Sequence, residues 1–223
     1  ILADVPSFGY RPRDIRNELA MPPKLTLKNI IQVLKKPEWA LKTLINGQPS
    51  FEVLKPYMPK SLNLKQLAKF MDSTFSGRLN EEKIKKLRDS WKGKLVIKGT
   101  ESIHDIEKAY KLGVDGVIIS NHGGRQVDVG QATVDSLKAI APIYKGKLKI
   151  MMDSGIRGGA DVARVLGVGA DFTFLGRSFM YGVSALGSKG GTHTISVIKK
   201  QLKQIMEQLG CSKIKDFVDT RIY

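Results

Sequence analysis

The 223-residue chain has 42% hydrophobic residues and a formal net charge of +16 at pH 7, the composition of a basic globular protein. This length allows one large domain or two small ones with a sizeable core. A single cysteine, Cys211, excludes an internal disulfide and is typical of a structural thiol in a reducing compartment. No apolar run approaches the roughly 18 residues that cross a bilayer, so we expect any membrane contact to be peripheral.

The chain opens on a short apolar run, Ile1–Val5, which predicts a strand. It has no initiator methionine, no basic n-region and no cleavage signal, so we expect neither a signal peptide nor a natural start of the protein. We therefore expect the chain to begin inside the fold.

The charge excess is concentrated in one region. Between Lys24 and Lys98 there are 17 Lys and Arg against 6 Asp and Glu, which accounts for +11 of the total +16. Such an excess indicates an anionic partner. Apolar and aromatic side chains are interleaved with the lysines, as in Pro37–Ile45, and this mixture resembles an interfacial membrane segment more than a nucleic-acid groove. The alternative is a solvated, lysine-rich insertion.

Four further apolar runs predict short buried strands, and the segments between them show helical periodicity. This alternation predicts βα units and a parallel sheet. A repeated pattern supports the prediction, because Gly113–Asp115 leads into one strand as Gly169–Asp171 leads into another. Each intervening helix is predicted to end at a glycine suited to a left-handed cap. The predicted strands are Lys94–Lys98, Gly116–Ser120, Lys149–Asp153 and Phe172–Gly176.

The residues capable of chemistry follow these strands, at one end of the predicted sheet. A (β/α)₈ barrel has its active site at the carboxyl ends of the strands, with phosphate bound after the last two. An open doubly wound sheet carries its phosphate turn after the first strand instead. Here the glycine and arginine turns come late, which favours an α/β fold of the (β/α)₈ TIM-barrel type. Since five strands are predicted, we expect about the last five βα units, with the first three absent.

The motif Ser120–Gln126 follows a predicted strand and is the most informative stretch of the chain. His122 can accept a proton near neutral pH, and Arg125 offers a planar set of donors matched to a carboxylate. Gly123 and Gly124 tolerate positive φ, so the backbone can turn both side chains toward one bound molecule. The alternative is a structural histidine beside a surface arginine.

Two later glycine turns are candidates for a single phosphate site. Asp153–Gly159 couples a strand-end carboxylate to a turn and a helix start, where backbone N–H groups attract phosphate. Leu175–Arg177 ends the next strand with a second cation. The alternative is a pair of ordinary connectors in which Arg157 pairs with Asp161.

Lys98 is predicted at the end of an apolar strand, where an ammonium costs free energy unless it meets a negative partner. That partner could be a phosphate, a substrate carboxylate or an anionic intermediate. The alternative is a lysine whose side chain reaches solvent at the strand edge.

Taken together, these motifs resemble the FMN-dependent α-hydroxy-acid dehydrogenase and oxidase family, in particular its membrane-associated bacterial L-lactate and (S)-mandelate dehydrogenases. The family signature is matched by Ser120–Gln126 and its phosphate turns by Asp153–Arg157 and Leu175–Arg177. Asp4–Pro6 and Gly9–Asp14 resemble the segment at the fourth barrel strand. The resemblance covers essentially all of residues 1–223, as the C-terminal part of one barrel domain with a basic insertion at about 24–79.

The resemblance implies a role for each candidate site residue. His122 would remove a proton from the substrate, and Asp4 would stabilise the imidazolium that forms. Arg11 and Arg125 would bind the substrate carboxylate. Lys98 would lie beside the flavin edge that becomes negative on reduction, as a catalytic and cofactor-binding residue. The other implied FMN contacts are Ser120, Asp153, Gly155, Arg157, Gly176 and Arg177; no metal is implied.

The implied activity is oxidation of an L-2-hydroxy acid, with L-lactate expected first and mandelate second, to the 2-oxo acid. FMN would take the electrons and pass them to a membrane quinone, in a homo-oligomer (a tetramer in the family) held peripherally at the cytoplasmic face of the inner membrane. A soluble oxidase is the alternative within the family. Outside it, an FMN or sugar-phosphate isomerase lacks a use for His122 with Arg125, and a nucleic-acid-binding module rests on charge alone.

Two departures from the family pattern bear on cofactor binding. Leu2 stands where the family usually has a threonine that contacts the flavin. The first flavin-binding loops and the N-terminal tyrosines of the family have no counterpart here. We therefore expect this chain alone to form an incomplete site, to be completed by the missing N-terminal part of the barrel.

Overall fold

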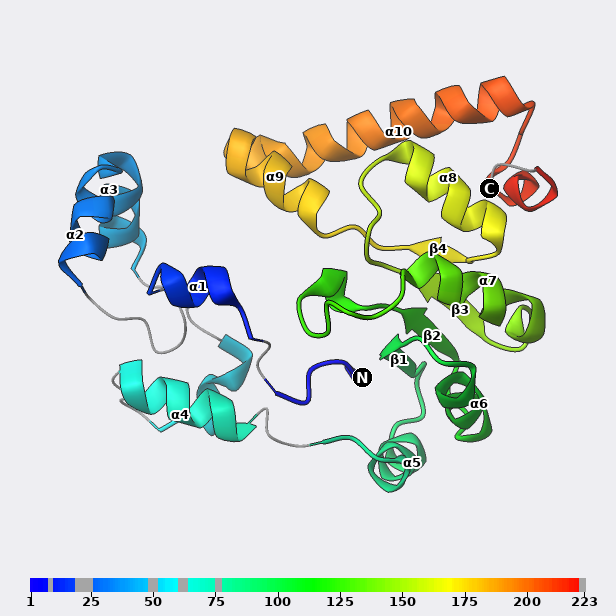
Figure 1. Cartoon of the computed structure of the whole chain (residues 1–223), viewed down its shortest axis with the longest axis horizontal. Helices are drawn as coiled ribbons and strands as arrows, with labels where there is room; N and C mark the ends of the chain where they lie inside the picture. The colour runs from blue at the N-terminus through cyan, green and yellow to red at the C-terminus, as the bar shows by residue number, and fades with distance from the viewer. Residues whose placement is uncertain (8–9, 19–25, 48–51, 60–63, 75–77, 221–223) are drawn as a thin grey trace. The chain divides into compact units, whose positions relative to one another are not determined.

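The computed structural model describes residues 1–7, 10–18, 26–47, 52–59, 64–74 and 78–220 (Figure 1). The chain divides into two compact units. One consists of Ile1–Pro6 with Arg78–Tyr223, and the other of Ser7–Gly77. The first unit contains every predicted site residue except Arg11.

The first unit is built on a parallel sheet of four strands in the order β1-β2-β3-β4. These are β1 (Val96–Thr100), β2 (Gly116–Ile119), β3 (Lys149–Met152) and β4 (Phe172–Thr173). Each new strand is added beside the previous one in the same direction, which is the order of a barrel and not of a doubly wound sheet. The predicted α/β fold with late units of a TIM barrel is therefore confirmed.

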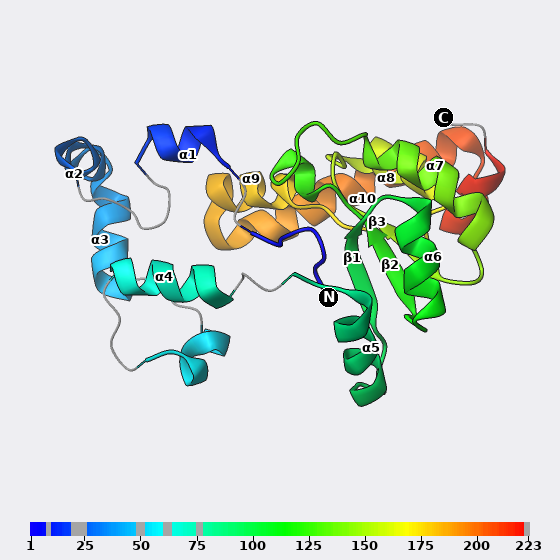
Figure 2. The same cartoon turned by 60° about the horizontal axis from the view of Figure 1, so that its bottom comes forward.

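Helices connect the strands and cover one face of the sheet. Figures 1 and 2 show α6 (Ile103–Lys111), α7 (Thr133–Tyr144) and α8 (Gly159–Val168) side by side along that face. The core between sheet and helices is fully apolar at its centre, where Val117 and Ile150 have no exposed surface. The remaining helices are α5 (Glu81–Ser90), α9 (Arg177–Leu186) and α10 (Gly190–Leu209), with the short turns Gly187–Lys189 and Ile214–Asp219.

The strand predicted at Ile1–Val5 is wrong in extent. Only Leu2 forms an isolated parallel bridge, to Lys98, supported by backbone hydrogen bonds from Lys98 N–H to Ile1 and from Ala3 N–H to Lys98. No bridge follows Leu2 in this described segment: β1 is irregular between Lys98 and Thr100, where Gly99 has φ of +94°, and the Asp4 side chain lies 3.4 Å from the Lys98 ammonium. At the opposite edge β4 has two residues in place of the five predicted, although Phe174 N–H still bonds to Met152.

The repeated Gly-x-Asp pattern has the same structural role twice. Asp115 accepts a hydrogen bond from Leu95 N–H (2.9 Å), and Asp171 accepts one from Ile150 N–H (2.9 Å). In each case the lysine directly before the donating residue, Lys94 or Lys149, also pairs with the carboxylate. The preceding glycines have φ of +73° and +124°, as the predicted helix caps require. The repeat therefore aligns the starts of neighbouring strands.

The second unit is helical in its described residues. It contains α1 (Pro12–Arg16), α2 (Leu27–Leu34), α3 (Pro37–Asn46), the 3₁₀ helix Glu52–Tyr57 and α4 (Leu64–Thr74). Helices α2 and α3 pack on each other. The unit begins before the predicted insertion start at about Lys24 and ends close to its predicted end at about Leu79. Across the described residues, none of the helices has the length and hydropathy to span a membrane.

Replacing Asp115 by Asn tests the strand-start contact. Hydrogen bonds from Lys94 and from Leu95 N–H lower the pKa of Asp115 from 3.8 to about 2. A carboxylate with a depressed folded pKa stabilises the fold above its unfolded pKa and loses that contribution as the pH falls through the folded value. We expect Asp115→Asn to lower Tm by several degrees at pH 7. The difference in Tm between the variant and the unaltered protein should shrink as the pH falls from 3.8 toward 2.

Thermal denaturation followed by circular dichroism across this pH range measures the effect. The control is Asp135→Asn, which removes a carboxylate that is exposed and lies 3.9 Å from Lys138. This variant is expected to leave Tm almost unchanged, because exposed pairs contribute little. A gap for Asp115→Asn that stays constant with pH would contradict the assigned cause.

Candidate active site

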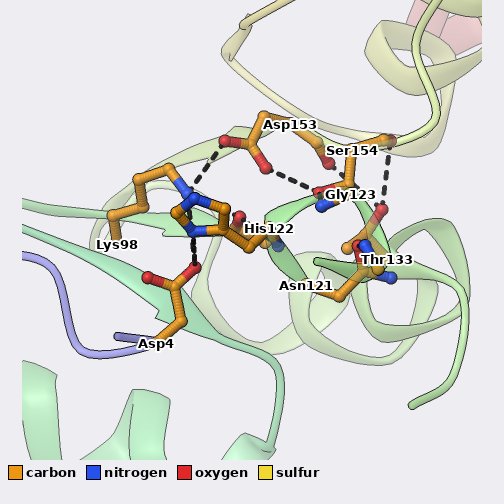
Figure 3. Close-up of polar contacts among 10 residues, drawn as sticks. Asp4, Lys98, Asn121, His122, Gly123, Thr133, Asp153 and Ser154 are labelled. Atoms are coloured by element: carbon orange, nitrogen blue, oxygen red, sulfur yellow. Dashed lines mark hydrogen bonds and ion pairs between the residues drawn. The ribbon is translucent and has the colours of Figure 1, made fainter. Parts of the chain in front are cut away.

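Four of the predicted site residues, Asp4, Lys98, His122 and Asp153, lie close together at the carboxyl edge of the sheet (Figure 3). Lys98 lies in β1, Ser120 and His122 follow β2, and Asp153 follows β3. Parallel strands end at the same edge, so three short loops from different parts of the chain meet there. The N-terminal segment brings Asp4 to the same place.

The Lys98 ammonium is held between two carboxylates. Its Nζ lies 3.1 Å from Asp153 Oδ2 and 3.4 Å from Asp4 Oδ2, and it donates a 2.7 Å hydrogen bond to Ser120 Oγ. The Lys98 side chain is 22% exposed, so these partners offset much of the cost of removing the charge from water. The interpretation of Lys98 as a lysine that reaches solvent is therefore wrong, since its partners are carboxylates within the site.

His122 is paired with Asp4 through Nδ1, at 3.0 Å from Asp4 Oδ2. Asp4 is 10% exposed, and its other oxygen, Oδ1, is buried without a hydrogen-bond partner among the described residues. The geometry assigns the ring proton to Nδ1, because the carboxylate can only accept. The second ring nitrogen, Nε2, is then the one that can accept a proton.

The His122 loop takes a left-handed path over three successive residues. The φ angles are +56° at His122, +66° at Gly123 and +72° at Gly124, as predicted for the two glycines. Each N–H of this turn meets a side-chain oxygen. His122 N–H donates to Ser120 Oγ (3.1 Å), Gly123 N–H to Ser154 Oγ (2.9 Å) and Gly124 N–H to Asn121 Oδ1 (3.3 Å).

The two glycine turns are tied to each other and to the His122 loop. Ser178 Oγ, in the first turn of α9, donates to Arg157 O (2.7 Å). Arg177 Nη2 donates to Gly123 O (2.7 Å). Asp161 accepts from Arg157 N–H (2.9 Å) and pairs with Arg164 at 3.4 Å. The alternative prediction of a side-chain pair between Arg157 and Asp161 is therefore wrong, and Arg157 is exposed toward the cavity that it lines.

A cavity of about 350 Å³ opens over this edge of the sheet. At Gly155 and Gly176 an added Cβ would meet nothing within 4 Å, so the backbone there borders open space. Asp4 and Ser120 lie outside the lining; Ser120 is 2% exposed and contacts Lys98. The predicted residues that line the cavity are Lys98, His122, Arg125, Asp153, Gly155, Arg157, Gly176 and Arg177.

Arg11 belongs to the second unit, where it precedes α1 and its Nη1 lies 3.9 Å from Asp14. Its pairing with Arg125 on a substrate carboxylate remains a prediction. Sequence reasoning missed Gly99, Thr133, Ser154 and Ser178 as parts of the site. The position of Gly99 directly after Lys98 could have indicated that it belongs to the site. Its close approach to Asp4, 95 residues earlier in the chain, has no local pattern that predicts it.

Comparison with known proteins gives the class of the protein. A family model described as FMN-dependent dehydrogenase matches residues 1–223. The chain belongs to this family, as its sequence motifs indicated, and FMN is the family's cofactor.

Relatives and solved structures agree with this class. An L-lactate dehydrogenase of Vibrio cholerae serotype O1 is 35% identical over 214 residues, 96% of this chain and 56% of the relative. An L-lactate dehydrogenase of Bartonella quintana is 34% identical with the same coverage. The monotopic membrane protein (S)-mandelate dehydrogenase superposes with a TM-score of 0.88 at 30% identity, over 97% of this chain and 57% of that one. The chain thus spans little more than half the length of these proteins.

Replacing Gly99 by Ala tests the approach of Asp4 to β1. An added Cβ would lie 2.4 Å from Asp4 Cβ, in a backbone with φ of +94°. The matched control is Gly146→Ala, where φ is +85° but nothing lies within 4 Å of the added Cβ. We expect the control to lose about 1 kcal/mol of unfolding free energy from backbone strain alone.

Gly99→Ala is expected to lose at least about 2 kcal/mol more, because Asp4 must move away from Lys98 and His122. Urea unfolding of both variants in the intact enzyme measures the difference. Equal losses would show that the contact with Asp4 imposes no constraint on residue 99.

Proposed function

We propose that the chain forms the catalytic part of an enzyme that oxidises an L-2-hydroxy acid to the 2-oxo acid with FMN as electron acceptor. The observation that carries this proposal is the pair His122–Asp4 beside Lys98 at the base of the cavity. A base with an oriented carboxylate partner suits proton removal from a hydroxy acid, and a cation next to it suits a cofactor that gains negative charge.

The residues present fit FMN. The Lys98 ammonium lines the cavity together with the open backbone at Gly155 and Gly176 and the side chains of Arg157 and Arg177. We infer that these glycines and arginines hold the phosphate, because arginine forks and exposed N–H groups at the start of α9 favour a dianion. Asp153, which lines the same cavity, would accept from the ribityl hydroxyls. When bound, FMN supplies a ring that accepts the two electrons of the oxidation.

The protein's own groups then have defined tasks. His122 accepts the substrate proton at Nε2, since Nδ1 carries the proton that points to Asp4. Asp4 stabilises the imidazolium that results. Arg125 lines the same cavity as His122 and would bind the substrate carboxylate, with Arg11 as its predicted partner. These roles serve a hydride route and a carbanion route equally.

L-lactate is the substrate that the comparisons favour, since the L-lactate dehydrogenases are 34–35% identical to this chain. Mandelate is the second candidate, because the (S)-mandelate dehydrogenase shares the fold at 30% identity. A mandelate oxidase has a similar structure at 23% identity and a TM-score of 0.70, which shows the fold alone and does not distinguish an oxidase from a dehydrogenase.

We further propose that the basic insertion at about 24–79, which makes up most of the Ser7–Gly77 unit, binds an anionic membrane surface, where electrons pass to a quinone. Helices α2 and α3 expose large apolar side chains among lysines: Leu34 is 72% exposed and Leu44 is 82% exposed. Apolar groups beside cations are what an interfacial segment requires. The (S)-mandelate dehydrogenase of similar structure is itself described as a monotopic membrane protein.

Replacing His122 by Gln tests the proposed base. The amide keeps a donor and an acceptor but cannot take up a proton, so we expect flavin reduction by L-lactate to slow about 10²–10⁴-fold. The measurement is anaerobic stopped-flow bleaching of flavin absorbance in the full-length enzyme, with bound FMN quantified beforehand. FMN content should stay stoichiometric in the variant.

The control for this experiment is His104→Gln, which changes an exposed histidine on α6 and should leave the reduction rate unchanged. Retained rapid reduction in His122→Gln would remove His122 from its assigned role. If L-lactate, (S)-mandelate and glycolate all fail to reduce the flavin of the unaltered enzyme, the proposed activity is wrong.

Introducing charges on α2 and α3 tests the membrane proposal. We expect the double variant Leu34→Glu/Leu44→Glu to lose at least tenfold in its partition onto phosphatidylglycerol vesicles, because two leucines that would enter the membrane are replaced by carboxylates facing anionic lipid. Ile214→Glu, which changes a residue 52% exposed in the first unit, is the control.

Deleting 24–79 should release the full-length enzyme completely. Unchanged co-sedimentation of either the double variant or the deletion variant would refute the proposal.

A further inference from the structure

We propose that Ser154 is a positioning residue whose hydroxyl closes a ring of polar contacts around the base. The inference rests on the proposed function, in which His122 takes the substrate proton and Asp153 binds the cofactor. Ser154 follows Asp153 on the loop after β3, and its side chain points to the His122 loop (Figure 3).

One half of the ring consists of charged contacts. His122 Nδ1 lies 3.0 Å from Asp4 Oδ2, which is 3.4 Å from Lys98 Nζ. Lys98 Nζ lies 3.1 Å from Asp153 Oδ2. This half connects the imidazole ring to the carboxylate on the neighbouring loop.

The other half passes through Ser154. Its Oγ donates a 2.8 Å hydrogen bond to Asp153 Oδ1 and accepts a 2.9 Å hydrogen bond from Gly123 N–H. Because Gly123 is covalently bonded to His122, these two hydrogen bonds return the chain of contacts to the base. One hydroxyl therefore fixes both the second oxygen of Asp153 and the backbone next to His122.

Backbone strain indicates that this hydroxyl is needed. Ser154 has φ of +73°, in the left-handed region where a residue with a Cβ is disfavoured. Among the described residues, the non-glycine residues with positive φ are Glu18, His122 and Ser154. The two non-glycine residues of positive φ that the structure describes in the first unit, His122 and Ser154, thus lie on adjoining loops. The hydrogen bond from Gly123 N–H to Ser154 Oγ joins these loops. A glycine would accept this φ freely, so a serine is favoured only for what its hydroxyl binds.

The turn itself has a second support that does not involve the serine side chain. Thr133, 3% exposed at the start of α7, donates through Oγ1 to Asp153 O (3.1 Å) and more weakly to Ser154 O (3.4 Å). The backbone of this turn is therefore stabilised by Thr133 of α7, independently of the Ser154 side chain. Removal of the Ser154 hydroxyl is expected to release the His122 loop from Asp153 while the turn after β3 stays folded.

Three N–H groups of the His122 loop donate to side-chain oxygens, and the acceptor Ser154 differs from the other two. Ser120 and Asn121, which receive the N–H groups of His122 and Gly124, lie on that loop or at its start. Ser154 is the one of these three acceptors that lies on another loop, the one after β3; Arg177 of α9 also contacts the His122 loop, by donating to Gly123 O. Ser154 therefore sets the position of the base relative to Asp153, and small errors in such a position slow reactions strongly.

Two substitutions in the full-length, FMN-bound enzyme separate positioning from stability. Ser154→Ala removes the hydroxyl and keeps the strained Cβ, whereas Ser154→Gly removes the hydroxyl and relieves the strain. We expect both to slow flavin reduction by L-lactate about tenfold, the effect of one lost positioning hydrogen bond. We expect Tm to fall in both variants, and to fall less in Ser154→Gly, because the glycine relieves the backbone strain that the alanine keeps.

Ser212→Ala is the matched control, since it removes a serine hydroxyl that contacts Asp216 in the C-terminal turn. It should leave the reduction rate unchanged. A reduction rate in Ser154→Gly within twofold of the unaltered enzyme would overturn the proposal, because the serine would then serve stability alone.

Hydrogen exchange provides a readout that does not depend on turnover. With FMN bound and no substrate, the peptide covering 120–126 should exchange faster in both Ser154 variants, because Gly123 N–H has lost its acceptor. Unchanged exchange would also overturn the proposal. If the unaltered enzyme is reduced by no 2-hydroxy acid, the proposed activity fails, while the exchange comparison still decides whether Ser154 holds the loop.

Discussion

The site depends on one ammonium group placed between two carboxylates. Lys98 Nζ lies within 3.4 Å of both Asp4 and Asp153, which come from opposite sides of β1 in the chain. A lysine that is largely removed from water must have such partners, and each partner alone would be a costly buried charge. The N-terminal segment, β1 and the loop after β3 are therefore stable in this arrangement only together. The left-handed conformation of Gly99 permits it, because no side chain stands between β1 and Asp4.

The same cluster orients the proposed base. Asp4 Oδ2 lies 3.0 Å from His122 Nδ1 and 3.4 Å from Lys98 Nζ, so one carboxylate oxygen contacts both the imidazole and the ammonium. Lys98 also lines the cavity, so the ammonium group that contacts Asp4 and Asp153 presents its positive charge to a molecule bound there. In the proposed function, this one lysine would contact both the carboxylate partner of the base and the bound cofactor.

Local patterns were sufficient to predict much of this structure. Apolar runs predicted the strands around Val117 and Ile150, and the glycines of the His122 loop predicted its left-handed turn. The extent of Ile1–Val5 was missed because its local apolar pattern does not show that the neighbouring strand β1 is irregular at Gly99, next to Asp4. Ser154 and Thr133 were missed because their contacts join different loops, and a serine or threonine beside a strand end has no pattern that names its partner. The role of Asp4 came only from family resemblance.

In the first unit, glycines occupy the left-handed positions at helix ends, whereas the site has non-glycine residues at such positions. At its helix ends the chain uses glycines such as Gly113, Gly169 and Gly210 for left-handed positions, so the repeated βα units are built without side-chain strain. His122 and Ser154 depart from this rule on adjoining loops. Each must be held by contacts that outweigh a cost of about 1–2 kcal/mol, and the contacts are the ring through Asp4, Lys98 and Asp153. The strained residues and the buried charges therefore stabilise one another, which explains why a site assembled from four separate segments has one defined geometry.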